Sequence, residues 1–311
     1  MRIVSLVPAG TDILFALGLG SHVVGVSHEC DIPAGAAPPP RLTRSTVALD
    51  GLSSAEIDAA IANQVAAGAP VYEIDADALA ALRPDLILTQ GLCDVCALPA
   101  RAVDTALCQL SWRPETLSLD AHDIPGVLET IRVIGEHTDH VRRAQALIDA
   151  LRARLDRAAS AVAARPRVPV VCLEWLDPPY ACGHWIPEMV ECAGGTELLG
   201  RPGMRSVPVP WADVERAHPA VVIAMPCGFD VARAARELDR VAACTPWARA
   251  VGDATVYVAA GGTYFTRPGP GLITGVEVLA SVLHPEVATW SVPAGAVTRW
   301  RAPITMQQEG R

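Results

Sequence analysis

Short apolar runs alternate along the chain with stretches of amphipathic, helical periodicity. Runs rich in β-branched residues and leucine predict strands at residues 3–6, 23–26, 85–89, 116–119, 168–173, 221–224 and 255–258. Stretches such as 54–67 and 99–107 place apolar residues at helical spacing between them. Strand–helix alternation is typical of parallel sheets whose strands are joined by crossover helices. The pattern therefore predicts an α/β fold with mainly parallel sheets flanked by helices.

One segment interrupts this alternation. From residue 138 to about residue 164 the apolar positions fall at helical spacing, with Arg and Asp opposite them. This pattern predicts a single amphipathic helix, which would be roughly 40 Å long at 1.5 Å per residue. Pro166 follows, and we expect it to end the helix because proline cannot continue one.

Patterns of similar length lie on both sides of this predicted helix. We therefore expect two α/β lobes, residues 1–124 and 166–290, joined by a connecting helix region at 125–165 that acts as one long backbone helix. The alternative is a single domain that carries the long helix on its surface. Residues 291–311 show no clear pattern and are expected to form an irregular or partly disordered tail.

Composition excludes several classes of function. The 311 residues carry a formal net charge of −9, and all 25 positively charged residues are Arg. Without lysine the chain has no P-loop lysine, no Schiff-base lysine and no kinase strand lysine. It has no basic tract, so we expect no nucleic-acid partner. No apolar run approaches the roughly 18 residues of a membrane span, so we expect no membrane insertion.

The first residues and the cysteines bear on location. Met1 is followed by a short apolar stretch and then by Pro8, without the basic region and longer apolar run of a secretory signal. Nine cysteines in a long chain are also unlike a small, disulfide-stabilised secreted domain. We therefore expect a cytoplasmic protein with reduced thiols.

Chemically distinctive residues follow the carboxyl ends of the predicted strands, the edge at which open α/β sheets bind ligands. If the two lobes face each other, these loops would line one shared cleft. Five aromatic side chains lie in them, and flat side chains suit a large planar ligand, although packing beneath the loops is the alternative. Two of the arginines in this set could hold an anionic group. The candidate ligand-binding residues are Pro8, Thr11, His28, Arg44, Glu174, Trp175, His184, Trp185, Phe229, Tyr264, Phe265 and Arg267.

Four loop cysteines, Cys30, Cys93, Cys96 and Cys227, are candidate metal ligands. Thiolate together with imidazole suits zinc, cuprous copper or an iron–sulfur cluster. A single C-x-x-C is a weak signal, because typical zinc motifs carry two such pairs, and Cys93 with Cys96 could instead be a redox pair. Buried packing is the other alternative. We expect packing for Cys108, Cys172, Cys192 and Cys244.

Several motifs resemble those of a known family. The segment from Ser5 to Gly18, the later Leu82-Arg83-Pro84-Asp85 and the run from His218 to Ile223 resemble cobalamin- and siderophore-type substrate-binding proteins of ABC importers. The resemblance spans roughly residues 1–285 and is to the class III (helical-backbone) group of these proteins. It implies two α/β lobes joined by one long helix, with the ligand held between them and little hinge motion.

Further motifs resemble a branch labelled cobalamin-binding protein. They are His28-Glu29-Cys30, Thr43-Arg44-Ser45, Leu92-Cys93-Asp94-Val95-Cys96, Leu173-Glu174-Trp175-Leu176-Asp177-Pro178-Pro179, Gly183-His184-Trp185-Ile186-Pro187-Glu188-Met189 and Met225-Pro226-Cys227-Gly228-Phe229-Asp230. Members of the transporter family proper are exported and dock onto a permease. Because no export signal is recognised here, delivery to an ABC permease is doubtful.

The leading hypothesis is a cytoplasmic ligand-binding protein that holds a tetrapyrrole, a metal complex or a metal centre between its lobes. Cobalamin, zinc and an iron–sulfur cluster are the candidate cofactors. One alternative is an enzyme that uses a Cys-ligated zinc or iron–sulfur centre on the same scaffold, although no spacing selects a nucleophile with its base. Another is an extracytoplasmic importer subunit whose signal peptide is encoded upstream.

Overall fold

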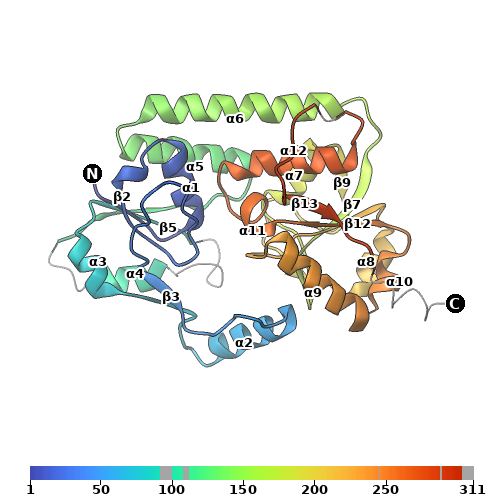
Figure 1. Cartoon of the computed structure of the whole chain (residues 1–311), viewed down its shortest axis with the longest axis horizontal. Coiled ribbons are helices and arrows are strands. Elements are labelled where there is room, and N and C mark those ends of the chain that lie inside the picture. The colour runs from blue at the N-terminus through green and yellow to red at the C-terminus, as the bar shows by residue number, and fades with distance from the viewer. Residues whose placement is uncertain (92–99, 108–111, 245, 288, 303–311) are drawn as a thin grey trace. The chain divides into compact units, whose positions relative to one another are not determined.

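The computed structural model describes residues 1–91, 100–107, 112–244, 246–287 and 289–302, and the chain forms two compact units (Figure 1). Unit 1 consists of Met1–Leu52, Ala59–Ala121 and Pro125–Ala150. Unit 2 consists of Ser53–Asp58, His122–Ile124 and Leu151–Arg311. Helix α6 (Val141–Val162) has residues in both units.

The elements that lie wholly or mainly in unit 1 follow the chain from its first residues. They are β1 (Ile3–Ser5), α1 (Pro8–Ala16), the 3₁₀ turn η1 (Gly20–His22), β2 (Val23–Val26), β3 (Thr43–Ser45), α2 (Ser54–Ala66), β4 (Tyr72–Ile74), α3 (Ala76–Leu82), β5 (Leu86–Thr89), α4 (Ala100–Leu107), β6 (Glu115–Ser118) and α5 (Ile124–His137). Four strands form a parallel sheet in the order β2-β1-β5-β6, and β3 pairs with β4 in a separate antiparallel ribbon.

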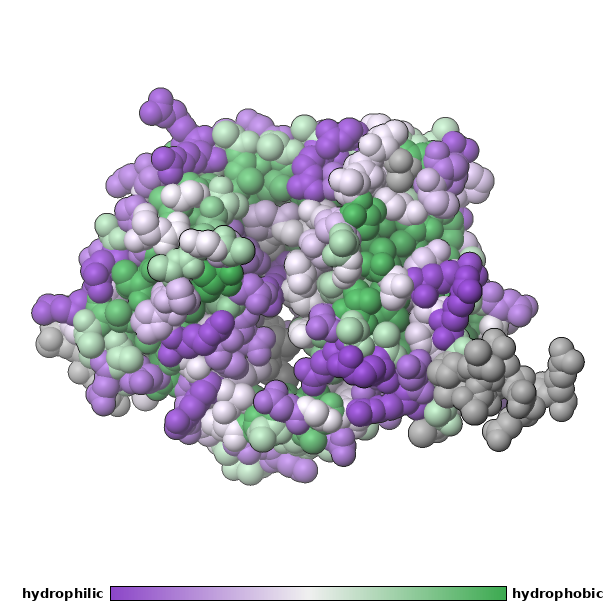
Figure 2. Space-filling view, in the orientation of Figure 1, coloured by the Kyte–Doolittle hydropathy of each residue, from purple (hydrophilic) through white to green (hydrophobic). Residues whose placement is uncertain are grey.

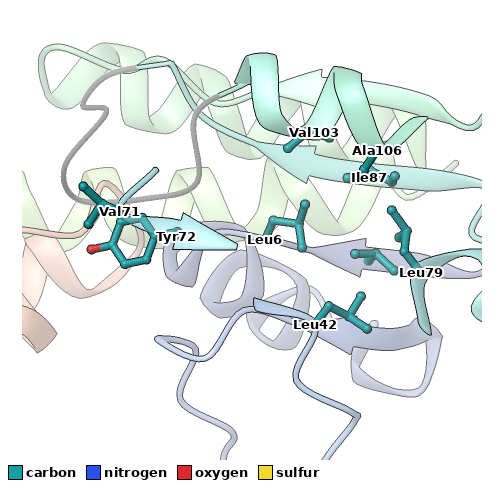
Figure 3. Close-up of a cluster of buried hydrophobic side chains, with 9 residues drawn as sticks. Leu6, Leu42, Val71, Tyr72, Leu79, Ile87, Val103 and Ala106 are labelled. Atoms are coloured by element: carbon teal, nitrogen blue, oxygen red, sulfur yellow. The ribbon is translucent and has the colours of Figure 1, made fainter. Parts of the chain in front are cut away.

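A buried hydrophobic cluster holds this sheet, the ribbon and two helices of unit 1 together (Figure 3). Burying one large aliphatic side chain stabilises a fold by roughly 1.5–3 kcal/mol, so the cluster as a whole stabilises the packing of these elements. Its buried members are Val4, Leu6, Leu42, Val71, Tyr72, Leu79, Ile87, Val103 and Ala106.

Unit 2 is built around a seven-stranded sheet. Its elements are β7 (Val168–Leu176), β8 (Pro179–Ala181), α7 (Ile186–Cys192), β9 (Gly195–Glu197), β10 (Val207–Pro208), α8 (Trp211–Ala217), β11 (Val221–Ala224), α9 (Val231–Cys244), α10 (Trp247–Val251), β12 (Thr255–Ala259), α11 (Gly261–Tyr264), α12 (Gly271–Leu283) and β13 (Val297–Arg299). The order is β10-β8-β7-β11-β12-β13, with β9 also paired to β7.

The central strands β7, β11 and β12 of this sheet are parallel, so their carboxyl ends lie at one edge. Strands β8 and β13 run antiparallel to their neighbours. Figure 1 shows α7 and α12 together on one side of the sheet, and α8, α9 and α10 on the other. Helices on both faces bury the sheet, which explains why its central strands are continuous apolar runs.

The predicted α/β class with mainly parallel sheets is confirmed, and each of the seven predicted strands is present. The long helix predicted from residue 138 begins instead at Val141, because the chain turns at Asp139, whose φ is +59°. In the described part of the tail, residues 297–299 form β13, which pairs with β12, and the other residues are irregular, as expected. Three residues are too few to show the alternation that marks a longer strand.

Polar residues cover much of the surface. On the face in view in Figure 2, hydrophilic residues are distributed over both units, with smaller areas of hydrophobic residues between them. No helix among the described residues has the length and apolar character that crossing a bilayer requires. Unit 1 and unit 2 therefore each present a mixed surface on this face.

Candidate functional site

In unit 1, the loops after β1 and β2 meet through a small cluster of buried polar atoms. Thr11 on α1 is buried, and its hydroxyl donates to the Cys30 Sγ at 3.1 Å. The Ser27 Oγ lies 3.4 Å from the same sulfur. Cys30 is 1% exposed, so its thiol holds the two loops together and does not face solvent. Pro8 begins α1, where its missing N–H costs no helical hydrogen bond.

His28, in the loop after β2, has a partly exposed imidazole ring. Its Nδ1 lies 2.7 Å from the Thr43 hydroxyl, and its ring is 5.3 Å from that of Tyr72. Burial lowers the pKa of His28, the nearby Glu29 raises it, and Arg41 lowers it further. The ring is thus oriented by Thr43 and Tyr72, with its other nitrogen 3.5 Å from Glu29.

Arg44 does not belong to that cluster. Its guanidinium pairs with Glu73 across the β3–β4 ribbon at 2.6 Å, and 80% of its side-chain surface is exposed. An exposed pair of this kind contributes at most about 1 kcal/mol to stability. Arg44 is available to an anion only if that anion displaces Glu73.

In unit 2, Glu174 on β7 contacts the loop after β8 and the segment before β10. Its carboxylate accepts hydrogen bonds from the Gly183 N–H at 3.0 Å and from the Ser206 hydroxyl at 2.5 Å. The Glu174 carbonyl also accepts from the Cys227 N–H at 3.0 Å, which ties in the loop after β11. Glu174 therefore positions three loops at the carboxyl edge of the sheet.

The predicted aromatic residues of unit 2 gather at the same edge, but most of them are packed. The Trp175 and Phe229 rings meet edge to face with centroids 5.4 Å apart, and the Trp185 indole N–H donates to the Phe265 carbonyl at 2.6 Å. Phe265 is fully buried, while Trp185 and Phe229 are 5% and 4% exposed. Trp185, Phe229 and Phe265 are therefore packed in the interior beneath the loops, as the packing alternative predicts.

Two of the remaining aromatic candidates and the last arginine keep part of their surface in solvent. Trp175 and Tyr264 are of intermediate burial, and the Trp175 indole N–H donates to the Ser54 carbonyl at 3.2 Å. Arg267 is also of intermediate burial. These residues remain candidates for direct ligand contact in unit 2.

His184 has the most unusual environment of the predicted residues. Its backbone adopts a φ of +49°, which is disfavoured for a residue with a β-carbon. The His184 N–H donates to the Met204 carbonyl at 2.6 Å, and the His184 carbonyl accepts from the Gly203 N–H at 2.9 Å. Strained residues held in place by their surroundings often lie at functional sites.

The His184 ring is stacked between two others. His122 lies parallel to it with centroids 5.7 Å apart, and Trp185 lies 5.3 Å away. The His184 Nε2 is buried, and no described residue offers it a hydrogen bond. Burial lowers the pKa of His184, and His122 and Arg205 lower it further. The result is a neutral imidazole with an unsatisfied nitrogen, the form in which histidine binds metals. Sequence reasoning did not single out His122, which has no local motif around it.

Acid should weaken the fold through this imidazole. The pKa of His184 is lower in the folded chain than the value of about 6.5 in an unfolded one, so the unfolded state binds its proton more readily. The stabilisation is present above about pH 6.5 and is lost as the pH falls toward the folded pKa. Urea unfolding across this range should show a shallower acid loss for His184→Gln than for the wild type; equal pH profiles would contradict the assignment.

The four predicted metal-ligating cysteines are spread over both units and a segment outside the described residues, so their grouping stays a prediction. Cys93 and Cys96 lie in that segment, Cys30 is in unit 1, and Cys227 is partly buried in unit 2. Of the described cysteines, Cys30, Cys172, Cys182, Cys192 and Cys227 are not in disulfides. The single group of three potential ligands found in the described parts of the chain is instead Cys172, Cys182 and Glu197. Cys172 is fully buried, as expected for a packed cysteine, and Cys182, which the sequence did not single out, is buried beside it.

Comparisons with known proteins show which proteins share this fold. No curated protein sequence matches the chain. Among solved structures it is similar to a periplasmic heme-binding protein from Pseudomonas aeruginosa, with a TM-score of 0.69 and 20% identity over 97% of this chain and 98% of that one. It is also similar to the periplasmic vitamin B12-binding protein BtuF of Vibrio cholerae, with a TM-score of 0.64 and 20% identity over 91% and 96% of the two chains.

A third similar structure is the periplasmic heme-binding protein BhuT in complex with two hemes, with a TM-score of 0.66 and 19% identity over 92% of this chain and 99% of that one. At these identities the likeness establishes the fold. The family model described as periplasmic binding protein matches residues 3–250. The resemblance of the sequence motifs to substrate-binding proteins is thus confirmed, and the chain belongs to the periplasmic binding protein family.

Proposed function

We propose that the protein binds a metal-containing tetrapyrrole and that the loops at the carboxyl edge of the unit 2 sheet contact it. The observation that carries the proposal is the buried Nε2 of His184, which has no hydrogen-bond partner among the described residues. An unpaired buried polar atom costs roughly 1–3 kcal/mol, and coordination to a metal centre would remove that cost once the loop admits the ligand. The neutral state of the ring favours coordination, because only an unprotonated nitrogen can bind a metal.

Two partly exposed aromatic side chains of unit 2 favour a planar ligand. Trp175 and Tyr264 keep part of their surface exposed in the same unit, and aromatic faces suit a macrocycle. The names of the similar structures add support, because two of those proteins are described as binding heme and one as binding vitamin B12. Heme and cobalamin are therefore the two ligands to test first. The cytoplasmic location and the absence of a permease partner stay predictions.

Equilibrium titration of the full chain tests the proposal. Ferric heme, aquocobalamin and metal-free protoporphyrin are added separately, and the visible absorption of each is followed. We expect saturable binding of one of the two metal complexes at micromolar concentration, with a change in its metal-dependent bands, and weaker binding of the metal-free ring. Failure of both complexes to bind at tens of micromolar would overturn the proposal.

A further inference from the structure

A second group of potential ligands lies inside unit 2 and is separate from the loop of His184. Two strands pair with the same edge of β7. Strand β9 pairs with Val168, Pro169 and Val170, and β8 pairs with the part of β7 that begins at Leu173. Cys172 lies at the junction, where neither strand supplies a regular partner. Cys182 follows β8 and donates its N–H to the Cys172 carbonyl at 3.2 Å. The topology therefore brings two thiols together across adjacent strands.

The carboxylate of Glu197, at the end of β9, fills the same junction. One of its oxygens accepts the Cys172 N–H at 3.0 Å, and the other accepts the N–H groups of Leu199 and Gly200, both at 3.0 Å. The ligand atoms of Cys172, Cys182 and Glu197 all lie within 4.8 Å of one another. A zinc ion binds sulfur at about 2.3 Å and carboxylate oxygen at about 2.0–2.2 Å, so ligand atoms at this mutual distance can close on one ion.

Two further features of this cluster support its assignment as a metal site. A β-carbon on Gly200 would lie 2.4 Å from the Cys182 Sγ, so only glycine leaves room for that sulfur. Three backbone N–H groups already orient Glu197, as outer hydrogen bonds orient ligands in metal sites. These three N–H groups need only the Glu197 carboxylate as their acceptor. Their hydrogen bonds therefore do not explain why two cysteines lie beside it.

The chemistry of the three ligands indicates which kind of ion the cluster would bind. Burial raises the pKa of Cys172 to about 12 and that of Cys182 well above its ordinary value, so both sulfurs carry protons when no ion is bound. The charged groups that act on these thiols are Glu197 and Glu174, both acidic. Two sulfurs with one carboxylate oxygen suit a divalent thiophilic cation such as zinc, whose sites in proteins combine these ligand types.

We propose that Cys172, Cys182 and Glu197 form a binding site for a divalent thiophilic cation, with zinc as the representative ion. Binding forms two metal–sulfur bonds and one metal–oxygen bond, and releases the two thiol protons to solvent. Because both cysteine side chains are buried, the ion enters while unit 2 folds, as for structural zinc sites. This site is independent of the tetrapyrrole proposed above.

Elemental analysis tests the proposal on the full chain. Wild-type protein is purified without chelator from cells grown with added zinc, next to Cys172→Ser/Cys182→Ser and the matched control Cys192→Ser, whose thiol lies in unit 2 outside the cluster. We expect the double variant to hold one zinc fewer per chain than the wild type, and the control to hold the same number. Equal zinc content in all three, or no zinc in the wild type, would overturn the proposal.

A second measurement covers the case in which the double variant does not fold. X-ray absorption at the zinc edge is recorded on a Cys93→Ser/Cys96→Ser chain, which removes the C-x-x-C as a competing zinc ligand set. We expect two sulfur neighbours and a lighter oxygen neighbour around the ion. A shell without sulfur would overturn the proposal. So would a Cys172–Cys182 disulfide in protein isolated with its thiols blocked at lysis, because oxidised sulfurs cannot serve as thiolates.

Discussion

Replacing Gly183 with alanine should lower the free energy of unfolding by roughly 3 kcal/mol, at the upper end of what overpacking costs. A β-carbon on Gly183 would lie 2.3 Å from the Met204 carbonyl oxygen and 2.5 Å from the Ser206 backbone nitrogen. Both atoms belong to the backbone, so a rotamer change cannot relieve the contact. The segment that holds His184 through Met204 and Glu174 through Ser206 must then move. Ligand affinity should therefore fall together with stability.

Gly203→Ala is the control for this variant. Gly203 lies in the same segment, has a φ of +70°, and leaves its β-carbon position free of neighbours within 4 Å. Alanine there should cost about 1–2 kcal/mol through backbone conformation and lower ligand affinity less than Gly183→Ala does, because its N–H can still donate to the His184 carbonyl. Urea unfolding and ligand titration of both variants check the prediction. Equal effects of Gly183→Ala and Gly203→Ala would show that the close approach at Gly183 does not position His184.

Removing Arg154 should destabilise unit 2 by about 3 kcal/mol, the lower end of the cost of breaking a buried ion pair. The Arg154 guanidinium donates to both carboxylate oxygens of Glu277, at 3.0 and 2.5 Å, and to the Thr274 hydroxyl at 2.9 Å. Only 7% of the Glu277 side chain is exposed, so Arg154→Ala leaves a buried negative charge. The cost stays at the lower end because Arg157, 3.8 Å from Glu277, still balances part of it.

Arg132→Ala provides the matched comparison. Arg132 also bonds to two carboxylates, those of Glu129 and Glu136, but on the exposed surface of α5. Its loss should cost at most about 1 kcal/mol. Differential scanning calorimetry of the two variants should give a clearly larger fall in melting temperature for Arg154→Ala. Similar falls would mean that burial of Glu277 contributes little to the stability of unit 2.

The parts of the fold that the sequence predicted are those in which one pattern dominates. The run 221–224 is four buried aliphatic or small residues in a short apolar segment bounded by Pro219 and Pro226, and it is β11 residue for residue. Strands β3, β8 and β13 were missed because each has three residues and pairs antiparallel with a partner that local periodicity does not reveal. Their positions depend on tertiary pairing, which overrides local propensity.

The candidate site shows the same division. Placement of Glu174 and His184 after predicted strands indicated that they lie at the ligand-binding edge of a sheet. Burial of Phe265 could not be predicted, because an aromatic residue in a loop can face the core or the solvent with the same local sequence. His122 meets His184 only through the tertiary fold. Cys172 and Cys182 meet only because β7 pairs with β8, and no metal-binding spacing marks them.

The most direct test of the central claim is the absorption spectrum of the metal complex bound to the full chain, compared between wild type and His184→Ala, each with and without free imidazole. We predict that the wild-type spectrum shows nitrogen coordination, that His184→Ala loses it, and that added imidazole restores it in the variant. Identical spectra of wild type and His184→Ala without imidazole would contradict the assignment of His184 as the metal ligand.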